Sequence, residues 1–348
     1  MKLKKLYAAL TAAAMMLTAT ACASSTTSSS DAASGTDSSV ADSTANTAEA
    51  ENNTDSDKTY NIGICQLVQH DALDAATQGF KDALTEKLGD KVTFDEQNAN
   101  GESTNCTTIC TGFVASGVDL ILANATGALQ AAAASTSTIP ILGTSVTDYA
   151  TALSMDNWTG ATGTNISGTS DLAPIDEQEK MLVEMFPDVK QVGIIYCSAE
   201  ANSKYQATLF GEALAADGIA YKEYSAADTN EISTVVSTAI TECDVLYVPT
   251  DNTMASSTET IKNIVVPAGI PVIAGEEGIC SGCGVATLSI SYYDIGYTTG
   301  EMAYDVLVNG ADISTMEVRF APNVTKKYNA AICEELGITA PEGYEAIG

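Results

Sequence analysis

The feature that most constrains the fold of this chain is a series of strand-like and helix-like segments that occurs twice. The apolar, strand-like runs pair as 61–69 with 192–200, 91–99 with 219–227, 119–123 with 244–248, and 139–146 with 270–277. The helix-period segments between them pair as 72–84 with 202–214 and 102–117 with 230–243. Short apolar runs that alternate with amphipathic helices are typical of βαβ units and a parallel sheet. The sequence therefore predicts two similar doubly wound, Rossmann-like α/β lobes.

Several of the predicted strands end in small polar or acidic residues. In DVLYVPTDN the run stops at Thr250, Asp251 and Asn252. In open α/β sheets ligands bind outside the carboxyl ends of the strands, where helix N-termini also point. Alternatively, these residues serve only to cap the next helix, because Asp and Asn are favoured N-caps. Helix capping and ligand binding are compatible roles. Since several strand ends repeat the pattern, we expect a binding cleft between the lobes.

The N-terminal segment is read as an export signal and a tether. Residues 1–21 have a Lys-rich start, an apolar stretch too short to span a bilayer, and small residues before Cys22. A Cys in this place resembles the bacterial lipoprotein signal, which predicts lipidation of Cys22, although Ala19 stands where Leu is usual. Residues 22–57 are rich in Ser, Thr, Ala and Asp and predict a disordered tether. We therefore expect a lipid-anchored protein on the extracytoplasmic face of the cell membrane.

Composition excludes several classes of function. A formal net charge of −30 argues against binding nucleic acid, which requires a basic face. Neither GxGxxG after the first strand nor GxxxxGK[ST] is present, and His70 is the single histidine, so we do not expect an enzyme. Cys280 and Cys283 form one CxxC, but a second is absent and zinc is not expected. A disulfide between these two is the less favoured alternative to free thiols. We predict no cofactor and no metal.

Segments along most of the chain after residue 58 carry a resemblance to a known family. They are IGICQLVQHDALDAATQGF, DLILANATGALQAA, ILGTSVTD, GTSDLAPIDEQ, EANS, YVPTDNTMAS, AGEEG and SYYDIGYTTGEMA. The sequence resembles the lipoprotein substrate-binding proteins of ABC importers, of the tryptophan/tyrosine type. Family members typically carry proline where this chain has Asp71 and Tyr149, so the loops near the pocket differ.

The resemblance implies a type I periplasmic-binding-protein fold, in which two lobes close on a hinge around a ligand. It implies an N-terminal lobe of 58–166 plus 292–312 and a C-terminal lobe of 167–291 plus 313–348. Crossings are expected near 164–170, 289–292 and 309–318. It also implies a monomer that delivers its ligand to an ABC permease in the membrane.

An amino acid ligand needs partners for both of its charges. For the ligand carboxylate we assign hydroxyls and backbone N–H groups at helix N-termini, namely Thr126, Gly127, Ser145 and Thr147. For the ammonium group, which must be paired when buried, we assign Asp251 first, then Glu276 and Asp148. Asn252 ends the same strand as Asp251. Asn202 and Ser203 are expected to clamp the ligand on closure. Gln66 is expected to contact either charged group of the ligand or its side chain.

The ring of an aromatic ligand needs apolar walls and a stacking partner. Candidates are Tyr149, Tyr196 and Tyr292, whereas Trp158 is assigned to the core or the hinge and His70 to the rim of the cleft. Two alternatives stay open on this scaffold. One is a binding protein for a nucleoside or a sugar, and the other is a module that senses a ligand for a membrane partner.

Overall fold

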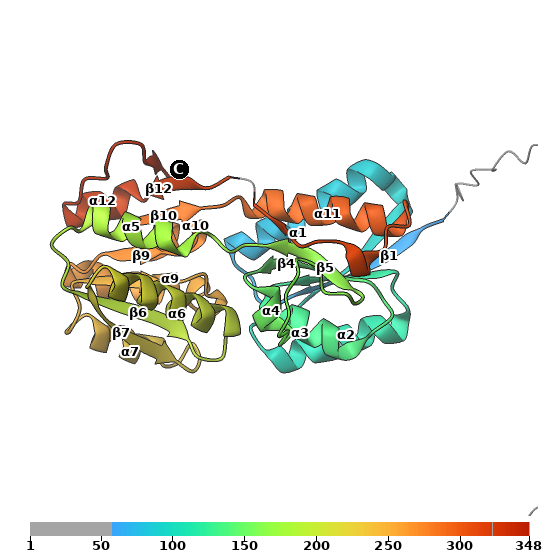
Figure 1. The fold of residues 1–348 in the computed structure, drawn as a ribbon, viewed down its shortest axis with the longest axis horizontal. Coiled ribbons are helices and arrows are strands. Elements are labelled where there is room, and N and C mark those ends of the chain that lie inside the picture. The colour runs from blue at the N-terminus through green and yellow to red at the C-terminus, as the bar shows by residue number, and fades with distance from the viewer. Residues whose placement is uncertain (1–57, 322, 348) are drawn as a thin grey trace, which may run out of the picture. The chain divides into compact units, whose positions relative to one another are not determined.

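The computed structural model describes residues 58–321 and 323–347, which form two α/β lobes (Figure 1). The predicted signal, Cys22 and the predicted tether lie outside the described residues. The sheet of the N-terminal lobe has the order β11-β5-β4-β3-β1-β2, and all its strands are parallel. Its strands are β1 (Tyr60–Gln66), β2 (Val92–Asn98), β3 (Leu120–Asn124), β4 (Ile141–Val146), β5 (Ile166–Ser170) and β11 (Arg319–Phe320). Its helices are α1 (Asp71–Leu88), α2 (Ser103–Ser116), α3 (Thr126–Ser135), α4 (Tyr149–Ala152) and α11 (Tyr292–Leu307), with short 3₁₀ turns at Gly89–Lys91 and Ile313–Thr315.

The sheet of the C-terminal lobe has the order β13-β12-β10-β9-β8-β6-β7, in which only the pair β10 and β12 is antiparallel. Its strands are β6 (Gln191–Cys197), β7 (Ala220–Ala226), β8 (Val245–Val248), β9 (Val272–Ala274), β10 (Ala286–Ser289), β12 (Thr325–Tyr328) and β13 (Glu345–Ala346). Its helices are α5 (Ile175–Met185), α6 (Ala201–Ala216), α7 (Ile232–Ala239), α8 (Asn252–Ala255), α9 (Thr258–Ala268), α10 (Glu277–Cys283) and α12 (Ala330–Leu336). None of the helices in the described part of the chain is long and apolar enough to cross a bilayer.

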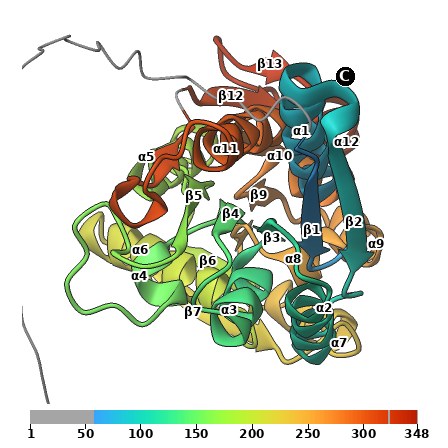
Figure 2. The same cartoon turned by 90° about the vertical axis from the view of Figure 1, so that its right-hand side faces the viewer.

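The duplication in the sequence is a duplication of topology. The strand order β5-β4-β3-β1-β2 of one lobe is repeated as β10-β9-β8-β6-β7 in the other. Figure 2 shows the strands of the N-terminal lobe with α1 and α11 on one side and α2 and α3 on the other. The prediction of two doubly wound, parallel α/β lobes is confirmed.

The chain crosses between the lobes at positions that partly differ from those expected. Strand β5 pairs with β4, so residues 167–170 belong to the N-terminal lobe, although the sequence assigned them to the other. Strand β11 pairs with β5, so the third crossing follows Phe320 and does not lie within 309–318. The second crossing is at Ile290 and Ser291, between β10 and α11. The Gly, Ser and Thr of β5 and the exposed two-residue β11 carry no apolar alternation that would mark them as strands.

Glycines allow close backbone contacts in the N-terminal lobe that fix the sheet and its covering helices. Gly168 in β5 has a φ of 144°, and a Cβ atom there would lie 2.0 Å from the Gly143 carbonyl oxygen. Between α1 and α11, a Cβ at Gly296 would lie 2.0 Å from the Ala76 carbonyl oxygen. The return of α11 to the N-terminal lobe therefore depends on a helix contact that only glycine permits.

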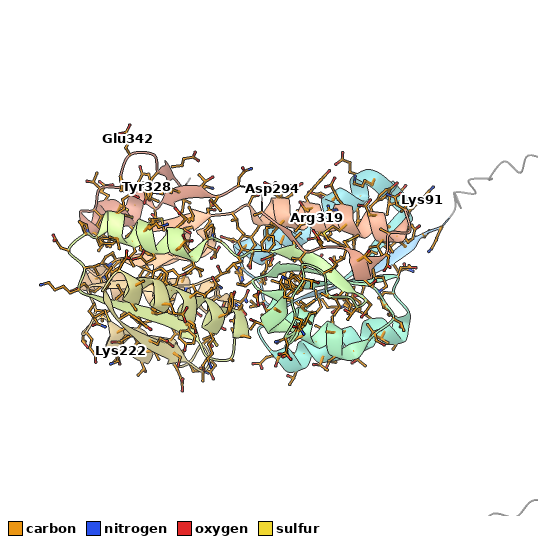
Figure 3. The ribbon with its side chains drawn as sticks, viewed as in Figure 1. Lys91, Lys222, Asp294, Arg319, Tyr328 and Glu342 are labelled. Atoms are coloured by element: carbon orange, nitrogen blue, oxygen red, sulfur yellow. The ribbon has the colours of Figure 1, made fainter. Side chains whose placement is uncertain are left out.

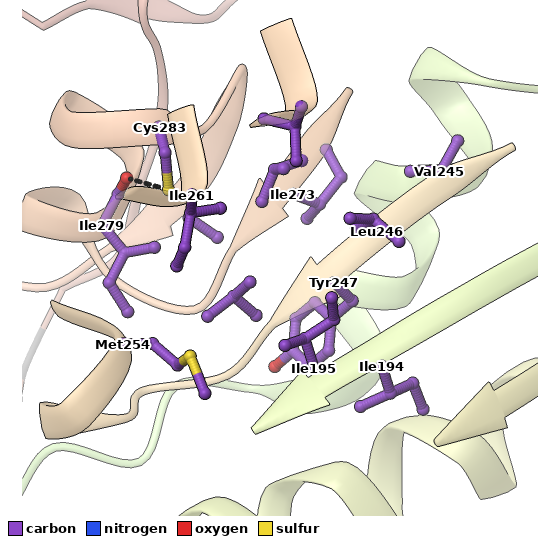
Figure 4. Close-up of a cluster of buried hydrophobic side chains, with 14 of the residues drawn as sticks. Ile194, Ile195, Val245, Leu246, Tyr247, Met254, Ile261, Ile273, Ile279 and Cys283 are labelled. Atoms are coloured by element: carbon purple, nitrogen blue, oxygen red, sulfur yellow. Dashed lines mark hydrogen bonds between the residues drawn. The ribbon is translucent and has the colours of Figure 1, made fainter. Parts of the chain in front are cut away.

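Each lobe has its own hydrophobic core. Figure 4 shows part of the C-terminal core, where Ile194, Leu246 and Tyr247 of the central strands cluster with Met254 and Ile279 from helices. The Tyr247 ring stacks on Phe210, with ring centroids 3.6 Å apart. Charged side chains such as Lys222 and Glu342 lie on the outside of the lobes (Figure 3). The apolar strand runs are thus buried, and the polar strand ends are left to face the other lobe.

Candidate ligand-binding site between the lobes

A small cavity lies between the lobes at the carboxyl ends of both sheets. It is lined by His70, Leu73, Ser145 and Asp171 of the N-terminal lobe, by Asn202, Thr250, Asp251, Asn252, Ala255 and Glu276 of the C-terminal lobe, and by Tyr292 at the second crossing. Its volume is about 10 Å³, the room of roughly one water molecule. The lobes are therefore closed on each other in this structure, and they must separate for a larger solute to enter.

Direct hydrogen bonds hold the closed lobes together. The His70 Nε2 atom lies 3.2 Å from the Asn252 Oδ1 atom. The Gln206 amide donates to the Thr147 hydroxyl across 3.4 Å. Beside the second crossing, within the N-terminal lobe, the Tyr292 hydroxyl donates to Asp171 across 2.9 Å. His70 and Asn252 thus line the cavity and also join the two lobes.

Asp251 lies at the cavity because β8 ends at Val248, three residues before it. Its carboxylate caps α8 by accepting from the Met254 N–H at 2.8 Å, and it accepts from the Cys197 N–H at 2.6 Å. Its side chain is 1% exposed. Burial, with a further contribution from the charge of Glu200, raises the pKa of Asp251 to about 8. The two readings of this residue, a helix cap and a cavity group, both hold.

Glu276 occupies the equivalent place after β9. It caps α10 by accepting from the backbone N–H groups of Gly278 and Ile279, and it is 2% exposed. Burial raises its pKa to about 7, and the charge of Asp171 acts in the same direction. The second predicted ammonium partner is therefore also a buried carboxylate at the cavity.

Asp171 is a cavity residue that the sequence reasoning did not select. It follows β5 directly, is 3% exposed, and accepts from the Thr147 hydroxyl at 3.0 Å and from the Tyr292 hydroxyl. Burial raises its pKa. The segment GTSDLAP carries the signal, an acid that ends a short strand, but it overlaps the crossing expected at 164–170.

The three buried carboxylates share one deficiency. Within residues 58–321 and 323–347, no lysine or arginine forms an ion pair with Asp171, Asp251 or Glu276. Their hydrogen-bond donors are neutral backbone and hydroxyl groups. A buried carboxylate without a cation is unfavourable, and it either binds a proton or acquires a positive partner. The cavity is thus suited to a cationic group.

Two predicted hydroxyls are buried and have no hydrogen-bond partner among the described residues. The Ser145 hydroxyl lines the cavity, from a backbone with a φ of 55° that is uncommon outside glycine. The Thr126 hydroxyl lies with Gly127 on a second groove between the lobes, of about 310 Å³, which also includes Asn202 and Asn252. An unsatisfied buried hydroxyl is costly, so both groups are suited to a polar ligand or to water.

Other predicted residues act around the cavity or away from it. Asn202 donates to the Thr250 carbonyl and to the Ser203 hydroxyl, and Ser203 itself is fully buried. Gln66 bonds to Asp74 and Thr77 of α1, so it is not among the cavity-lining residues. Asp148 caps α4 through the Thr151 N–H and is half-exposed, likewise outside the cavity lining. For these last two the local hydrogen bonds, rather than a ligand, account for the residue type.

Of the aromatic candidates, one lines the cavity. Tyr292 does so, whereas Tyr149 donates to the Thr169 carbonyl and stacks on Trp158 inside the N-terminal lobe. Tyr196 bonds to Glu223 on the neighbouring strand. Trp158 packs against the core of its lobe, as its assignment to packing anticipated.

Thiols and acids do not assemble into a metal site in the described part of the chain. All eight cysteines from Cys65 to Cys333 are buried and free, Cys280 and Cys283 included. Two similar α/β lobes that enclose a polar cavity at their strand ends define a solute-binding protein of the type I periplasmic kind.

Comparison with known proteins agrees with this class. The family described as ABC transporter substrate binding protein matches residues 61–346. A tyrosine-binding protein of Clostridioides difficile (strain R20291) is 37% identical over 266 residues, covering 76% of this chain and 77% of that one. The chain belongs to the ABC transporter substrate-binding family, and it is the solute-binding component of a transporter. Membership implies an extracytoplasmic component, and the relatives are binding proteins rather than enzymes.

Two solved structures sharpen the comparison. An ABC domain from Streptococcus pneumonia in complex with L-Trp is 30% identical, with a TM-score of 0.79, covering 83% of this chain and 100% of that one. A ligand-free, open substrate-binding protein with adhesive properties from Clostridium difficile is 36% identical, with a TM-score of 0.64, covering 83% and 99%. The chain is thus more similar in shape to the L-Trp complex than to the open protein, although its sequence is closer to the latter. The lobes of this chain are closed, whereas those of the ligand-free relative are open.

Proposed function

We propose that this protein captures an aromatic L-amino acid in the cavity between its lobes and presents it to an ABC permease in the membrane. The observation that carries the proposal is a set of three buried carboxylates, Asp171, Asp251 and Glu276, around one cavity. Among the described residues, no lysine or arginine lines this cavity. An ammonium group supplies the missing charge. The tyrosine-binding relative and the relative in complex with L-Trp support an aromatic ligand.

In this proposal the ammonium and carboxylate groups of the amino acid bind to different side chains. The ammonium group lies among the three carboxylates, and the ligand carboxylate accepts from the Ser145 hydroxyl. Leu73 and Ala255 supply apolar contacts for the ring, and Tyr292 positions Asp171 through its hydroxyl. Thr147 acts indirectly, because its hydroxyl donates to Asp171. Thr126, Gly127, Asn202 and Asn252 line the adjoining groove, through which the ligand enters.

Closure follows from the placement of these groups on both lobes. Ser145 and Asp171 belong to one lobe, whereas Asp251 and Glu276 belong to the other. A ligand that bonds to both lobes gains contacts that the open form does not offer, so it shifts the population towards the closed form. The permease then recognises the closed form.

The direct test is a binding measurement on residues 58–348, unfolded and refolded to remove bound solute. Thermal unfolding and titration calorimetry with the twenty amino acids, nucleosides and simple sugars should give a shift with tyrosine, tryptophan or phenylalanine, because a ligand of the native state raises the melting temperature. A response to a nucleoside or a sugar alone would contradict the proposal.

A pair of variants tests the role of the carboxylates. Asp171→Asn removes one cavity charge, and Asp176→Asn removes an exposed charge on α5 that is paired with Lys180. We expect the first to weaken binding by about tenfold to a hundredfold, since a hydrogen bond to a charged group contributes about 1.5–3 kcal/mol. The second should leave binding unchanged. Equal affinities for both variants would exclude Asp171 from the site.

We further propose that Cys22 is lipidated and anchors a monomeric protein to the extracytoplasmic face of the membrane. The short apolar segment before Cys22 and the polar segment after it support this. The full chain should partition into the detergent phase of a cloud-point extraction, and Cys22→Ala should move it to the aqueous phase. Light scattering of residues 58–348 should give the mass of one chain.

A further inference from the structure

His70, the single histidine, lies at the cavity and contacts the opposite lobe. It precedes α1, its ring lines the cavity, and its Nε2 atom lies 3.2 Å from the Asn252 Oδ1 atom. Which nitrogen carries the proton is decided by the neighbours of the ring, not by the ring itself.

The orientation of the Asn252 amide is fixed by Glu200. The Glu200 carboxylate accepts from the Asn252 Nδ2 group at 2.7 Å and from the Asn252 backbone N–H at 3.1 Å. It also accepts from the backbone N–H and the hydroxyl of Thr253. An ionised carboxylate only accepts, so the amide must present its NH₂ group to Glu200 and its oxygen to His70.

The tautomer of His70 follows. Since the Asn252 oxygen only accepts, the His70 Nε2 atom is the donor. Burial lowers the pKa of His70, which favours the neutral ring, with Nδ1 as a bare acceptor. This Nδ1 atom is buried and has no hydrogen-bond partner among the described residues. An acceptor in this condition is costly unless a donor reaches it.

The position of His70 indicates which part of the ligand supplies that donor. Glu276 and Tyr292 mark the hinge end of the cavity, because both also line the space beside the interlobe crossings. Asn202 and Asn252 mark the other end, which continues into the groove. The Nε2 atom of His70 contacts Asn252, so this side of the ring lies towards the groove end. With the ammonium group held among Asp171, Asp251 and Glu276, the ring of the ligand extends towards His70.

We propose that His70 recognises the polar group on the ring of the bound amino acid through a hydrogen bond. Its Nδ1 atom accepts a hydrogen bond from the phenol O–H of tyrosine or the indole N–H of tryptophan, a donor that phenylalanine lacks. His70 is then a specificity-determining residue as well as a contact between the lobes. This inference rests on the proposed function and adds to it a ranking of ligands.

Two substitutions separate the two nitrogens. His70→Gln keeps a polar group where Nε2 contacts Asn252 but removes the acceptor at Nδ1. His70→Asn keeps a polar group near Nδ1 but removes the contact with Asn252. Gln69→Ala changes an exposed neighbour and is the matched control. Titration calorimetry gives the dissociation constants of tyrosine, tryptophan and phenylalanine for each protein.

The wild type and Gln69→Ala should bind phenylalanine about tenfold more weakly than tyrosine, the effect of one neutral hydrogen bond. His70→Gln should bring this ratio close to one, chiefly by weakening tyrosine and tryptophan. His70→Asn should weaken all three ligands by a similar factor and keep the preference. The inference is overturned if wild type binds the three ligands equally, or if His70→Gln weakens them by one common factor. Binding of none of the three by the wild type would instead refute the proposed function.

Discussion

The two lobes have the same strand order but place different chemistry at equivalent strand ends. After β3 the helix α3 begins at Thr126, and its N-cap residue Ala125 makes no side-chain hydrogen bond, whereas after β8 the helix α8 is capped by the buried Asp251. After β4 the cap is the half-exposed Asp148, whereas after β9 it is the buried Glu276. The cap carboxylates of the C-terminal lobe thus line the cavity.

The N-terminal lobe offers mainly hydroxyls at the same boundary. Ser145 lines the cavity, Thr126 lines the groove, and Thr147 supports Asp171, the one cavity acid of this lobe. The comparison teaches that a duplicated scaffold can bind an unsymmetrical molecule. Because one wall carries most of the negative charge, an amino acid has one favoured orientation between the walls.

The largest effect on stability is expected at β5, the strand of the N-terminal sheet that corresponds to β10 in the C-terminal sheet. Gly168→Ala places a Cβ atom 2.0 Å from the Gly143 carbonyl oxygen, at a φ of 144°. We expect a loss of about 3–5 kcal/mol of unfolding free energy, since both overlap and backbone strain contribute. Urea unfolding measures it. Gly112→Ala, in open space on α2, is the control and should not destabilise the protein. Equal stability of the two variants would contradict the tight β4–β5 contact.

The next effect concerns the cap that faces the cavity. Asp251→Asn should weaken amino acid binding by about a hundredfold, because the ammonium group loses a charged acceptor and the new NH₂ group opposes the Cys197 N–H. The same exchange at Asp148 should not change binding. Titration calorimetry on the two variants measures the affinities. A similar loss of affinity in both would show that the caps of the two lobes do not differ in ligand binding.

The stability of the ligand-free protein should depend on pH through the two cavity acids of the C-terminal lobe. Burial raises the pKa of Asp251 from 3.8 to about 8 and that of Glu276 from 4.5 to about 7. Both groups prefer the protonated form when folded, so their contribution to stability is full below their unfolded values and is lost as pH rises through about 7 to 8. The ligand-free protein should therefore become less stable between pH 4 and pH 8.

Ligand binding should reverse this titration. An ammonium group favours the ionised carboxylates, so binding near pH 7 should release about one proton. Calorimetry in buffers with different ionisation enthalpies gives the number of protons released. Asp251→Asn should reduce it. A binding enthalpy independent of the buffer would show that the carboxylates are ionised before the ligand arrives.

A smaller effect on affinity is expected from the cavity hydroxyl of the N-terminal lobe. Ser145→Ala removes a buried hydroxyl that has no partner among the described residues. Affinity should fall by about threefold to tenfold, the range of one neutral hydrogen bond, while the ligand-free protein keeps or gains stability. Melting temperatures with and without ligand separate the two contributions. Lower stability without ligand would indicate a structural role for Ser145.

The smallest effect belongs to the exposed cap. Asp148→Ala should cost about 1 kcal/mol of stability, the usual contribution of a helix N-cap, and should leave affinity unchanged. A change in ligand affinity would restore Asp148 to the binding residues.

The fold could be predicted because its signal is local and repeated. Apolar runs such as 192–197 and the helices that follow them specify strand, helix and parallel sheet without reference to the rest of the chain. Short polar elements escaped this reasoning. Strand β5 is held by contacts of Gly168 with Gly143 and Tyr149, which are far from it in the sequence.

The sequence by itself determined the two lobes, the polar strand ends and the carboxylates Asp251 and Glu276, because strand periodicity places the end of a strand within a residue or two. Only the tertiary structure decided which polar ends meet. It brought Asp171 and Tyr292, 121 positions apart, into one hydrogen bond, and it turned Gln66 and Asp148 to other partners. The reason is physical: a side chain's partners depend on which strands and helices pack side by side, and that packing depends on contacts that no local pattern encodes.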